Sequence, residues 1–257
     1  MKISAVIIAF NEEAKIADAI RSLDWADEVL MVDSGSTDRT LDIAGELGAK
    51  VIVNEWPGFA VQKQLAVDRA ASEIIFSLDA DETVSAELKA EIIALKAGDK
   101  LPFDGFTVPR ASIYMSREIR HGSWYPDRQL RLFDRRKAGW KQVVIHESVE
   151  MQPGASTGAL KHDIIHRSVD SVGHHAEMIV RRYAPLGAKA SYNLGRRTSP
   201  LKIAVAGPSA FVQDYILKAG FMDGVPGLFI ALFSAYHAVL KHMMLYEMQH
   251  ADESAAD

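Results

Sequence analysis

Acidic residues cluster at the end of an apolar run in the stretch EIIFSLDADETVSAEL. Asp79, Asp81 and Glu82 would repel one another in a buried position, so the cluster requires a cation or an exposed surface. Paired hard oxygen ligands suit Mg²⁺ or Mn²⁺ held jointly with the phosphate oxygens of a substrate. Residues two apart in extended chain project to the same side, so Asp79 and Asp81 are expected to share one target.

The chain up to about residue 110 alternates apolar strands with helical segments. Strands are predicted at 2–10, 28–33, 50–54 and 73–79. Continuous Val/Ile-rich strands separated by helices indicate a doubly wound α/β half, with a parallel sheet covered on both faces. We expect Asn11 to cap the first helix, Gly48 to end the second and Ser85 to cap the fourth.

Polar residues of three predicted strands meet at one edge of this sheet. Asn11 lies just past the first strand, Asp33 ends the second, and Asp79 and Asp81 end the fourth. Sheets of this kind bind ligands at the carboxyl ends of their strands. The alternative is that these residues only form strand-end turns and a helix cap, as Asp and Ser commonly do. Their convergence favours a ligand crevice.

Composition narrows the class of protein. The chain has 257 residues and a net charge of −5, which gives no bulk attraction for nucleic acid. It has no cysteine, so disulfides, thiolate zinc sites and a cysteine nucleophile are excluded. No apolar stretch is expected to be long enough to span a bilayer, and the best candidate is 227–240.

Three segments carry a resemblance to a known family. VIIAFNEE, VDSGSTDRT and FSLDADE resemble the signature segments of inverting family 2 glycosyltransferases of the GT-A fold. WYPDRQLRLFDRR and VIHESVE further resemble the bacterial lipopolysaccharide core β-glucosyltransferase branch. The similarity is strong in the first half and extends to about residue 150.

The resemblance implies a fold and an activity. The fold would be α/β, a GT-A domain over 1–168 with a Rossmann-like, mostly parallel sheet. The residue pattern itself predicts a helical extension over 169–250 and a disordered tail at 251–257. The nucleotide-sugar half would be 1–110 and the acceptor-side half 111–168. The activity would be metal-assisted transfer of a sugar, glucose from a UDP-sugar, onto a lipopolysaccharide core or related glycan.

The resemblance also implies roles for residues at the strand ends. Phe10 stands where the family has an aromatic residue stacked on the base, and Asp33 matches a carboxylate that accepts a hydrogen bond from uracil. Lys63 matches a basic residue facing the diphosphate, and Asp79 and Asp81 match the motif whose second acid ligates the bridging metal. The donor-binding set is Ala9, Phe10, Asn11, Glu12, Asp33, Ser34, Gly35, Lys63, Asp79, Ala80 and Asp81.

An inverting transfer needs a general base for the acceptor hydroxyl. The Glu-Asp pair that many relatives use is not evident in this sequence. We expect Glu147, after a short apolar strand, to be the base, with His146 as a metal or phosphate neighbour. Asp127 is the rival base, and His146 fits a hydrogen-bonded strand-end histidine equally well.

The acceptor side offers basic and aromatic candidates. Arg128 and Arg131 lie near the predicted base, where they could bind an anionic acceptor or the diphosphate. Trp124 and Tyr125 are candidate sugar-stacking residues. The alternatives are a solvated basic strand face and, for Trp124, an anchor in the core.

The last third of the sequence reads as helices, basic first and then apolar. Basic residues precede 227–240, namely Arg181, Arg182, Arg196, Arg197 and Lys202. This pattern suits peripheral contact with anionic headgroups, with ordinary packing or a homo-oligomer interface as alternatives. We expect a cytoplasmic protein, peripheral on the cytoplasmic face of the inner membrane if its acceptor is a glycolipid.

Two other functions fit a metal-binding α/β crevice. A nucleotidyltransferase that makes nucleotide sugars would carry a Gly-rich phosphate loop after the first strand, whereas AFNEEAK is acidic and has no glycine. A catalytically silent nucleotide-sugar-binding protein would tolerate loss of its acids, yet Asp33, Asp79 and Asp81 are all present.

Overall fold

The computed structural model describes residues 1–141, 148–167 and 169–254. They form two compact units: Met1–Ala111 with Asp127–His166, and Ser112–Pro126 with Arg167–Asp257. Residues 112–126, which the sequence analysis assigned to the first domain, thus pack with the C-terminal helices. The predicted boundary at residue 168 stays a prediction.

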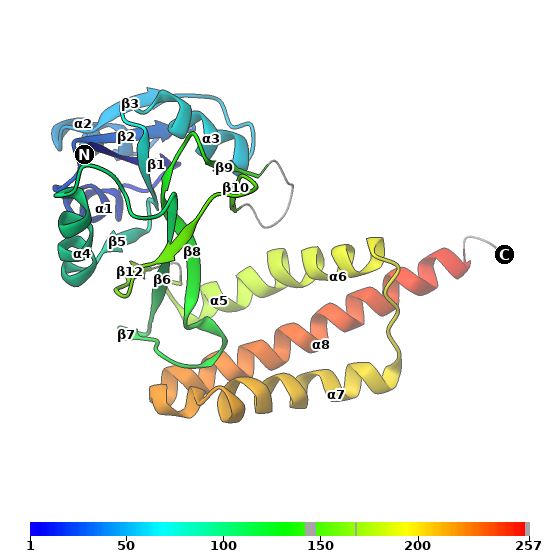
Figure 1. The fold of residues 1–257 in the computed structure, drawn as a ribbon. Helices are drawn as coiled ribbons and strands as arrows, with labels where there is room; N and C mark the ends of the chain where they lie inside the picture. The colour runs from blue at the N-terminus through cyan, green and yellow to red at the C-terminus, as the bar shows by residue number, and fades with distance from the viewer. Residues whose placement is uncertain (142–147, 168, 255–257) are drawn as a thin grey trace. The chain divides into compact units, whose positions relative to one another are not determined.

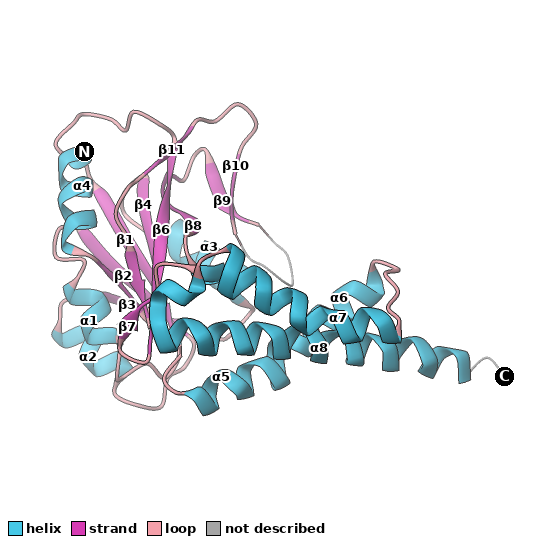
Figure 2. Ribbon diagram, turned by 90° about the horizontal axis from the view of Figure 1, so that it is seen from below, coloured by secondary structure: helices cyan, strands magenta, loops and turns pink. Residues whose placement is uncertain are grey.

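The first unit is built on a parallel sheet (Figures 1 and 2). Its parallel strands lie in the order β3-β2-β1-β4. Their bounds are β1 Ile3–Ala9, β2 Glu28–Asp33, β3 Lys50–Val53 and β4 Ile74–Asp79. All four strands predicted from the sequence are confirmed, because each is an apolar run with no glycine or proline in it.

Helices cover both faces of this sheet. They are α1 (Ile16–Arg21), α2 (Thr40–Glu46), α3 (Phe59–Arg69) and α4 (Ala86–Lys96). On β1, Ile7 packs in the core cluster that holds residues of α1, α2 and α4, and its neighbour Val6 packs in the cluster that holds residues of α3. Opposite faces of one strand are therefore both buried, which is why the strands are continuously apolar.

Further strands extend the sheet beyond β4. Strand β8 is antiparallel to β4 and to β6, and β12 is antiparallel to β5. These elements are β5 (Glu82–Val84), β6 (Gly105–Tyr114), β8 (Asp127–Asp134), β11 (Thr157–Ala159) and β12 (Ile164–His166). A separate pair joins β9 (Ala138–Trp140) to β10 (Val149–Met151). The predicted α/β class with a mostly parallel sheet is confirmed.

Two of the three predicted helix boundaries are confirmed. Ser85 Oγ accepts a hydrogen bond from the Leu88 N–H at 3.1 Å, and Gly48 follows α2 at φ 79°. The predicted cap at Asn11 is wrong, because α1 begins only at Ile16. Asn11 instead adopts φ 55°, a left-handed conformation that asparagine tolerates better than most residues.

The second unit is mainly helical, as predicted. Its helices are α5 (Val172–Met178), α6 (Ala184–Asn193), α7 (Pro200–Phe211) and α8 (Gly224–Ser254). π-helical turns η2 (Ile179–Tyr183) and η3 (Val212–Leu217) interrupt them, with 3₁₀ turns η1 (Gly122–Trp124) and η4 (Gly220–Asp223) and the short strand β7 (Arg117–Glu118). Helix α8 packs along both α6 and α7 (Figure 1). It extends to Ser254, into the segment predicted to be disordered.

Helix α8 overturns one expectation from the sequence. In the part of the chain that the structure describes, one helix, Gly220–Ala251, is long and apolar enough to cross a membrane by length and composition. The expectation that no stretch reaches this length was therefore wrong. The helix extends well beyond 227–240 because the interrupting histidines and Lys241 do not end it.

Two buried carboxylates fix residues 112–126 to the helices. Asp214 Oδ1 accepts a hydrogen bond from the Ser123 N–H, and Asp223 Oδ2 accepts one from the His121 N–H at 2.8 Å. Both carboxylates are 2% exposed. Backbone donors of the connecting loop are thus satisfied inside the helical unit.

An aromatic cluster fills the core of the same unit. The ring of Trp124 lies 5.5 Å from that of Tyr114 and 5.2 Å from that of His175, and His175 also contacts Phe233. His175 Nδ1 lies 3.2 Å from the Tyr114 hydroxyl. Burial, with a small contribution from His174, lowers the pKa of His175 to about 4.

This buried histidine predicts a stability that depends on pH. The unfolded chain binds a proton at His175 near pH 6.5, whereas the folded unit does so only near pH 4, so stability present above pH 6.5 is lost as the pH falls to 4. The loss is at most about 3 kcal/mol. Urea unfolding across this range should show a flatter pH dependence for His175→Phe and an unchanged one for His162→Gln at an exposed site. An equal slope in His175→Phe and the wild type would contradict this assignment.

Candidate active site

The carboxyl ends of the parallel strands bring the predicted residues to one edge. Ala9 pairs in register with Asp33, and Ile8 pairs with Asp79. The convergence expected from the sequence is therefore confirmed for the ends of β1, β2 and β4. A ligand at this edge would meet side chains from three strands at once.

Asp79 is held between two buried cations. Lys63 Nζ lies 2.7 Å from its Oδ1, and Arg131 Nη2 donates to its Oδ2 at 3.0 Å. Burial alone would raise the pKa of Asp79, but the Lys63 ammonium and the Arg131 guanidinium hold it well below the usual range. Lys63 also lies over the Trp140 ring, 4.6 Å from its centroid.

Arg131 connects Asp79 and Lys63 to a further acid, the buried Glu82. Its Nη2 donates to Glu82 Oε1 at 2.7 Å, and Arg110 Nη1 donates to the same oxygen at 3.0 Å. Glu82 Oε2 accepts a third bond from the Asp79 N–H. Burial would lower the pKa of Arg131, but Glu82 and Asp79 raise it above the ordinary arginine value, so it stays charged. Glu82 holds the two arginines together, a role that sequence reasoning missed.

Asp127 is the next member of this network. Arg110 Nε donates to its Oδ2 at 2.9 Å, and Gln129 Nε2 donates to its Oδ1 at 2.6 Å. Both oxygens of the rival base are thus engaged by neighbouring side chains. Lys63, Asp79, Arg131, Glu82, Arg110 and Asp127 form one continuous chain of ion pairs.

Asp81 has a different partner from Asp79. Strand β4 ends at Asp79 and a turn follows at Ala80, so the alternation of extended chain does not apply and the two acids do not share a target. Asp81 Oδ2 lies 3.2 Å from His166 Nε2. Burial would raise the pKa of Asp81, but the contact with His166 lowers it below its ordinary value.

His166 is the residue that sequence reasoning missed. It reaches Asp81 because β12 pairs with β5 and sets His166 opposite Glu82. A signal existed, since DIIHRS repeats the apolar pair and histidine of VVIHES, where His146 was chosen. A single sequence does not tell which of two such strands pairs beside the acidic turn.

The Asp81–His166 pair has the chemistry of a divalent cation site. The observed 3.2 Å separation of their ligating atoms is close to the distance of about 3 Å between neighbouring ligands of an octahedral ion with bonds of about 2.1 Å. Among the described residues no group of three or more His, Cys, Asp or Glu could hold a metal. A cation here would take its other ligands from substrate or water.

Two loops at the ends of β1 and β2 are joined by hydrogen bonds. The Asn11 N–H donates to Ser36 Oγ at 2.8 Å, and Asn11 Oδ1 accepts from the Thr37 N–H at 2.9 Å. Phe10 precedes this contact and is 55% exposed. An aromatic side chain this exposed at the ligand edge can stack on a planar ring.

Asp33 has a structural role in the turn after β2. It is fully buried, and its Oδ1 accepts bonds from the Gly35 and Ser36 N–H groups at 2.8 and 2.7 Å. Its Oδ2 accepts a bond from Ser36 Oγ. The alternative considered from the sequence, a strand-end turn, therefore describes Asp33 in this structure. Gly35 is required there by its φ of 89°.

Ser34 and Glu12 also contribute to the loops. Ser34 Oγ accepts a bond from Gln62 Nε2 at 3.1 Å, and the Glu12 N–H donates to Thr40 Oγ1 at 2.8 Å. Ala80 is buried within the turn between the two acids.

Three of the remaining predicted residues make other contacts in the structure. Arg128 has a different partner from Arg131, since its Nη1 donates to the Leu160 carbonyl at 3.1 Å. Trp124 and Tyr125 belong to the helical unit, where Trp124 joins the aromatic cluster and Tyr125 stacks with Arg120. The predicted residues His146 and Glu147 lie outside the described residues.

Two hydrogen-bonding nitrogens of Arg131 have no partner among the described residues. It is 3% exposed, and its Nε and Nη1 make no hydrogen bond within the described part of the chain. Buried donors without partners are costly. An anionic ligand that reached them would remove this cost.

The sheet order and the acidic turn at its carboxyl edge define the class as an α/β enzyme of the GT-A fold. The family model "Glycosyl transferase family 2" matches residues 4–154, and the chain belongs to this family. The chain is therefore a glycosyltransferase, and the nucleotidyltransferase and silent-binder alternatives are set aside.

Similar proteins agree with this assignment. An "Uncharacterized glycosyltransferase" of Rickettsia bellii is 29% identical over 96% of this chain and 87% of its own length. The "Lipopolysaccharide core biosynthesis glycosyltransferase LpsC" of Rhizobium meliloti is 28% identical over 96% of this chain and 93% of its own. The resemblance to the lipopolysaccharide core branch is thus confirmed.

Solved structures give a weaker likeness. S. aureus TarS 1-349 in complex with UDP-GlcNAc aligns over 98% of this chain and 92% of its own, with a TM-score of 0.48 and 12% identity. Glucosyl-3-phosphoglycerate synthase from Mycobacterium tuberculosis, in complex with Mn²⁺, UDP and glucosyl-3-phosphoglycerate, covers 42% of this chain and 43% of its own, with a TM-score of 0.34 and 27% identity.

The buried network predicts that Arg131 contributes much more to stability than Arg136, five residues further along the chain. Arg131→Met should destabilise the protein by about 3–5 kcal/mol, because Asp79 and Glu82 lose a buried counterion. Arg136→Met removes a guanidinium that is 65% exposed in its ion pair with Asp134, and it should cost about 1 kcal/mol or less. Urea unfolding at pH 7 measures both. Equal losses in the two variants would show that the Arg131 network adds no stability beyond a surface pair.

Proposed function

We propose that this chain is an inverting glycosyltransferase that moves glucose from UDP-glucose to a lipopolysaccharide core or related glycan. The observation that carries the proposal is the acidic turn after β4, where Asp79 is paired with Lys63 and Arg131 and Asp81 is paired with His166. One carboxylate thus holds cations and the other lies beside an imidazole, an arrangement suited to a diphosphate with a divalent ion.

Asp81 and His166 are the proposed ligands of Mg²⁺ or Mn²⁺, replacing the set of Asp79, Asp81 and His146 expected from the sequence. Asp79 is poorly suited because two cations already hold its oxygens. When bound, the ion neutralises the charge that develops on the diphosphate leaving group. Lys63 and the free nitrogens of Arg131 supply further positive charge for the diphosphate.

The nucleoside would lie at the ends of β1 and β2. The exposed ring of Phe10 supports stacking on the uracil base. Asp33 positions the Gly35–Ser36 turn through its own hydrogen bonds, and this turn holds Asn11 in place. Its proposed part in base recognition is therefore to shape the loop.

Glu147 is the proposed general base. It would accept the proton of the acceptor hydroxyl as the oxygen attacks the anomeric carbon from the face opposite the diphosphate. Asp127 is less suited, since Arg110 and Gln129 engage both of its oxygens. The glycan acceptor and its lipid anchor would place the enzyme at the cytoplasmic face of the inner membrane.

Metal-dependent nucleotide binding tests the site. With UDP and Mn²⁺ near a hundred times the dissociation constant, unfolding should require about 2.7 kcal/mol more, and EDTA should abolish the gain. Asp81→Asn and His166→Gln should lose the metal-dependent part, while His162→Gln, at an exposed histidine, should keep it. Retention of the gain in His166→Gln would remove His166 from the ligand set.

Transfer kinetics test the base. Glu147→Gln should lower glucose transfer from UDP-glucose to truncated lipopolysaccharide by about 10²–10⁴-fold, with UDP–Mn²⁺ binding unchanged. Asp127→Asn should act mainly through stability, because it breaks the pair with Arg110. If transfer survives in Glu147→Gln and is lost in folded Asp127→Asn, the base is Asp127.

A further inference from the structure

Helix α7 and the turn η3 carry a row of exposed apolar side chains. Leu201, Val205, Val212 and Ile216 recur at spacings of four and seven residues, which puts them on one helix face. Each is exposed, Leu201 by 73% and Ile216 by 52%. An exposed apolar row of this length marks an interaction surface.

Helix α8 carries a second such row. Val225, Leu232, Tyr236 and Met243 recur at spacings of seven and four residues and are all exposed. Only 17% of the most apolar 18-residue window of this helix is buried. The helix therefore keeps most of its apolar surface outside the core.

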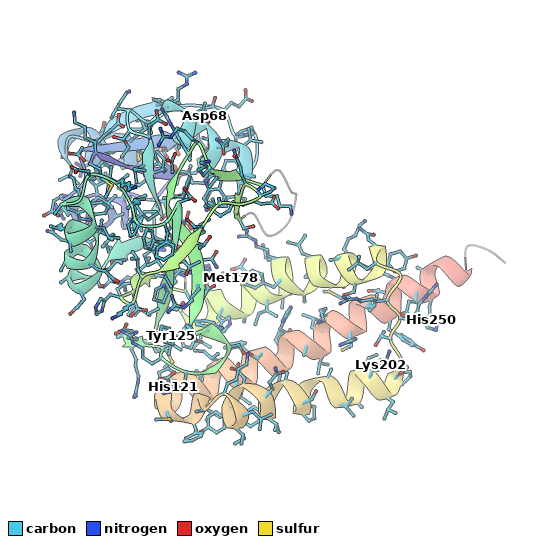
Figure 3. All side chains as sticks on the ribbon, viewed as in Figure 1. Asp68, His121, Tyr125, Met178, Lys202 and His250 are labelled. Carbon is cyan, nitrogen blue, oxygen red and sulfur yellow. The ribbon has the colours of Figure 1, made fainter. Side chains whose placement is uncertain are left out.

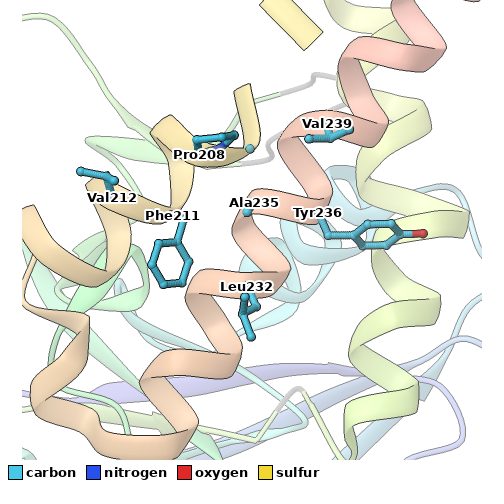
Figure 4. Close-up of a pocket in the computed structure, with 8 residues that line it drawn as sticks. Pro208, Phe211, Val212, Leu232, Ala235, Tyr236 and Val239 are labelled. Atoms are coloured by element: carbon cyan, nitrogen blue, oxygen red, sulfur yellow. The ribbon is translucent and has the colours of Figure 1, made fainter. Parts of the chain in front are cut away.

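A groove between α7 and α8 joins the two rows (Figure 4). It has a volume of about 470 Å³ and is lined by Gly207, Pro208, Phe211, Val212, Leu232, Ala235, Tyr236 and Val239. The Tyr236 hydroxyl is the only polar side-chain atom among these residues. The groove is suited to a hydrocarbon chain and offers almost nothing to a polar ligand.

The charge of residues 178–246 points to an anionic partner. Residues 178–246 contain eight Lys or Arg and only two acidic residues, Asp214 and Asp223, in a chain of net charge −5. Both acids are buried and hydrogen-bonded. The exposed charged residues of this stretch are thus all basic, namely Arg182, Lys189, Arg196, Arg197, Lys202, Lys218 and Arg181, the last of which pairs with Glu177.

We propose that the face of α7, η3 and α8 docks on an anionic lipid bilayer, with the two rows in the headgroup–acyl boundary and the basic side chains on lipid phosphates. Lys202 (Figure 3) and Lys218 lie at the two ends of the apolar row on α7 and η3. At these positions the apolar row can enter the boundary while the lysines contact lipid phosphates. A second copy of the chain is a poorer occupant, because it would bring basic faces together.

The polar contacts of α8 favour lying on the membrane over crossing it. Ser234 donates to Asp214, His242 contacts Thr198, and Gln249 accepts a bond from the Thr198 N–H. These groups hold α8 to its neighbours, and the exposed row of Val225, Leu232, Tyr236 and Met243 lies outside these contacts. An interfacial helix requires such a division of its faces.

Sedimentation with vesicles tests the proposal on the full chain without donor or acceptor, so its outcome is independent of glycosyl transfer. Phosphatidylcholine vesicles containing phosphatidylglycerol should bind the protein at least about tenfold better than phosphatidylcholine alone at about 0.1 M salt, and less well at about 1 M. Val205→Glu with Ile216→Glu should lower this binding by about tenfold or more.

Ile93→Glu is the matched control, since Ile93 is a comparably exposed isoleucine on α4 of the other unit. It should bind vesicles as the wild type does. Circular dichroism and thermal unfolding establish that each variant is folded.

Three outcomes would overturn the proposal. The first is equal vesicle binding by the double variant and the control. The second is a dimer in light scattering that Ile216→Glu dissociates, without binding to vesicles, which would assign the face to a second copy. The third is resistance of the bound protein to alkaline extraction, which would make α8 a spanning helix.

Discussion

The buried guanidinium of Arg131 is the interaction on which the ligand edge depends. It lies between Asp79 and Glu82, two acids that the sequence sets three residues apart across a tight turn. Without a cation between them they would repel in a low-dielectric interior. Because Arg131 belongs to β8 and both acids flank the end of β4, this ion pair also fixes the antiparallel strand against the parallel half of the sheet.

This arrangement separates the two acids of the Asp-Ala-Asp motif. Asp79 is turned inward and neutralised by Lys63 and Arg131, whereas Asp81 follows the turn and lies beside His166. Identical side chains two residues apart therefore have different chemistry because the strand ends between them. Asp79 holds Lys63 and Arg131 in place, and Asp81 lies beside the imidazole with which it is proposed to bind the metal.

Features set by local sequence pattern were predicted correctly, whereas residue roles set by the pairing of distant strands were not. The four parallel strands and the Ser85 cap followed from apolar runs and a local hydrogen bond, and the convergence of Asp33 and Asp79 followed from parallel topology. The roles of His166 and Glu82 required knowledge that β12 pairs with β5 and that β8 brings Arg131 inward. The prediction for Asn11 was wrong because its side-chain oxygen accepts a hydrogen bond from the Thr37 N–H in the loop after β2 instead of capping a helix.

Both units use buried carboxylates, but to different ends. In the first unit, the buried Glu82 and the partly buried Asp79 are paired with Lys63, Arg131 and Arg110, so charged groups are kept at the carboxyl edge of the sheet. In the second unit, Asp214 and Asp223 are buried and accept hydrogen bonds from backbone and hydroxyl donors, so neither lies on the exposed surface of the helices. Their burial therefore stabilises the loop 112–126 within the helical unit, whereas the buried acid of the first unit holds two arginines together.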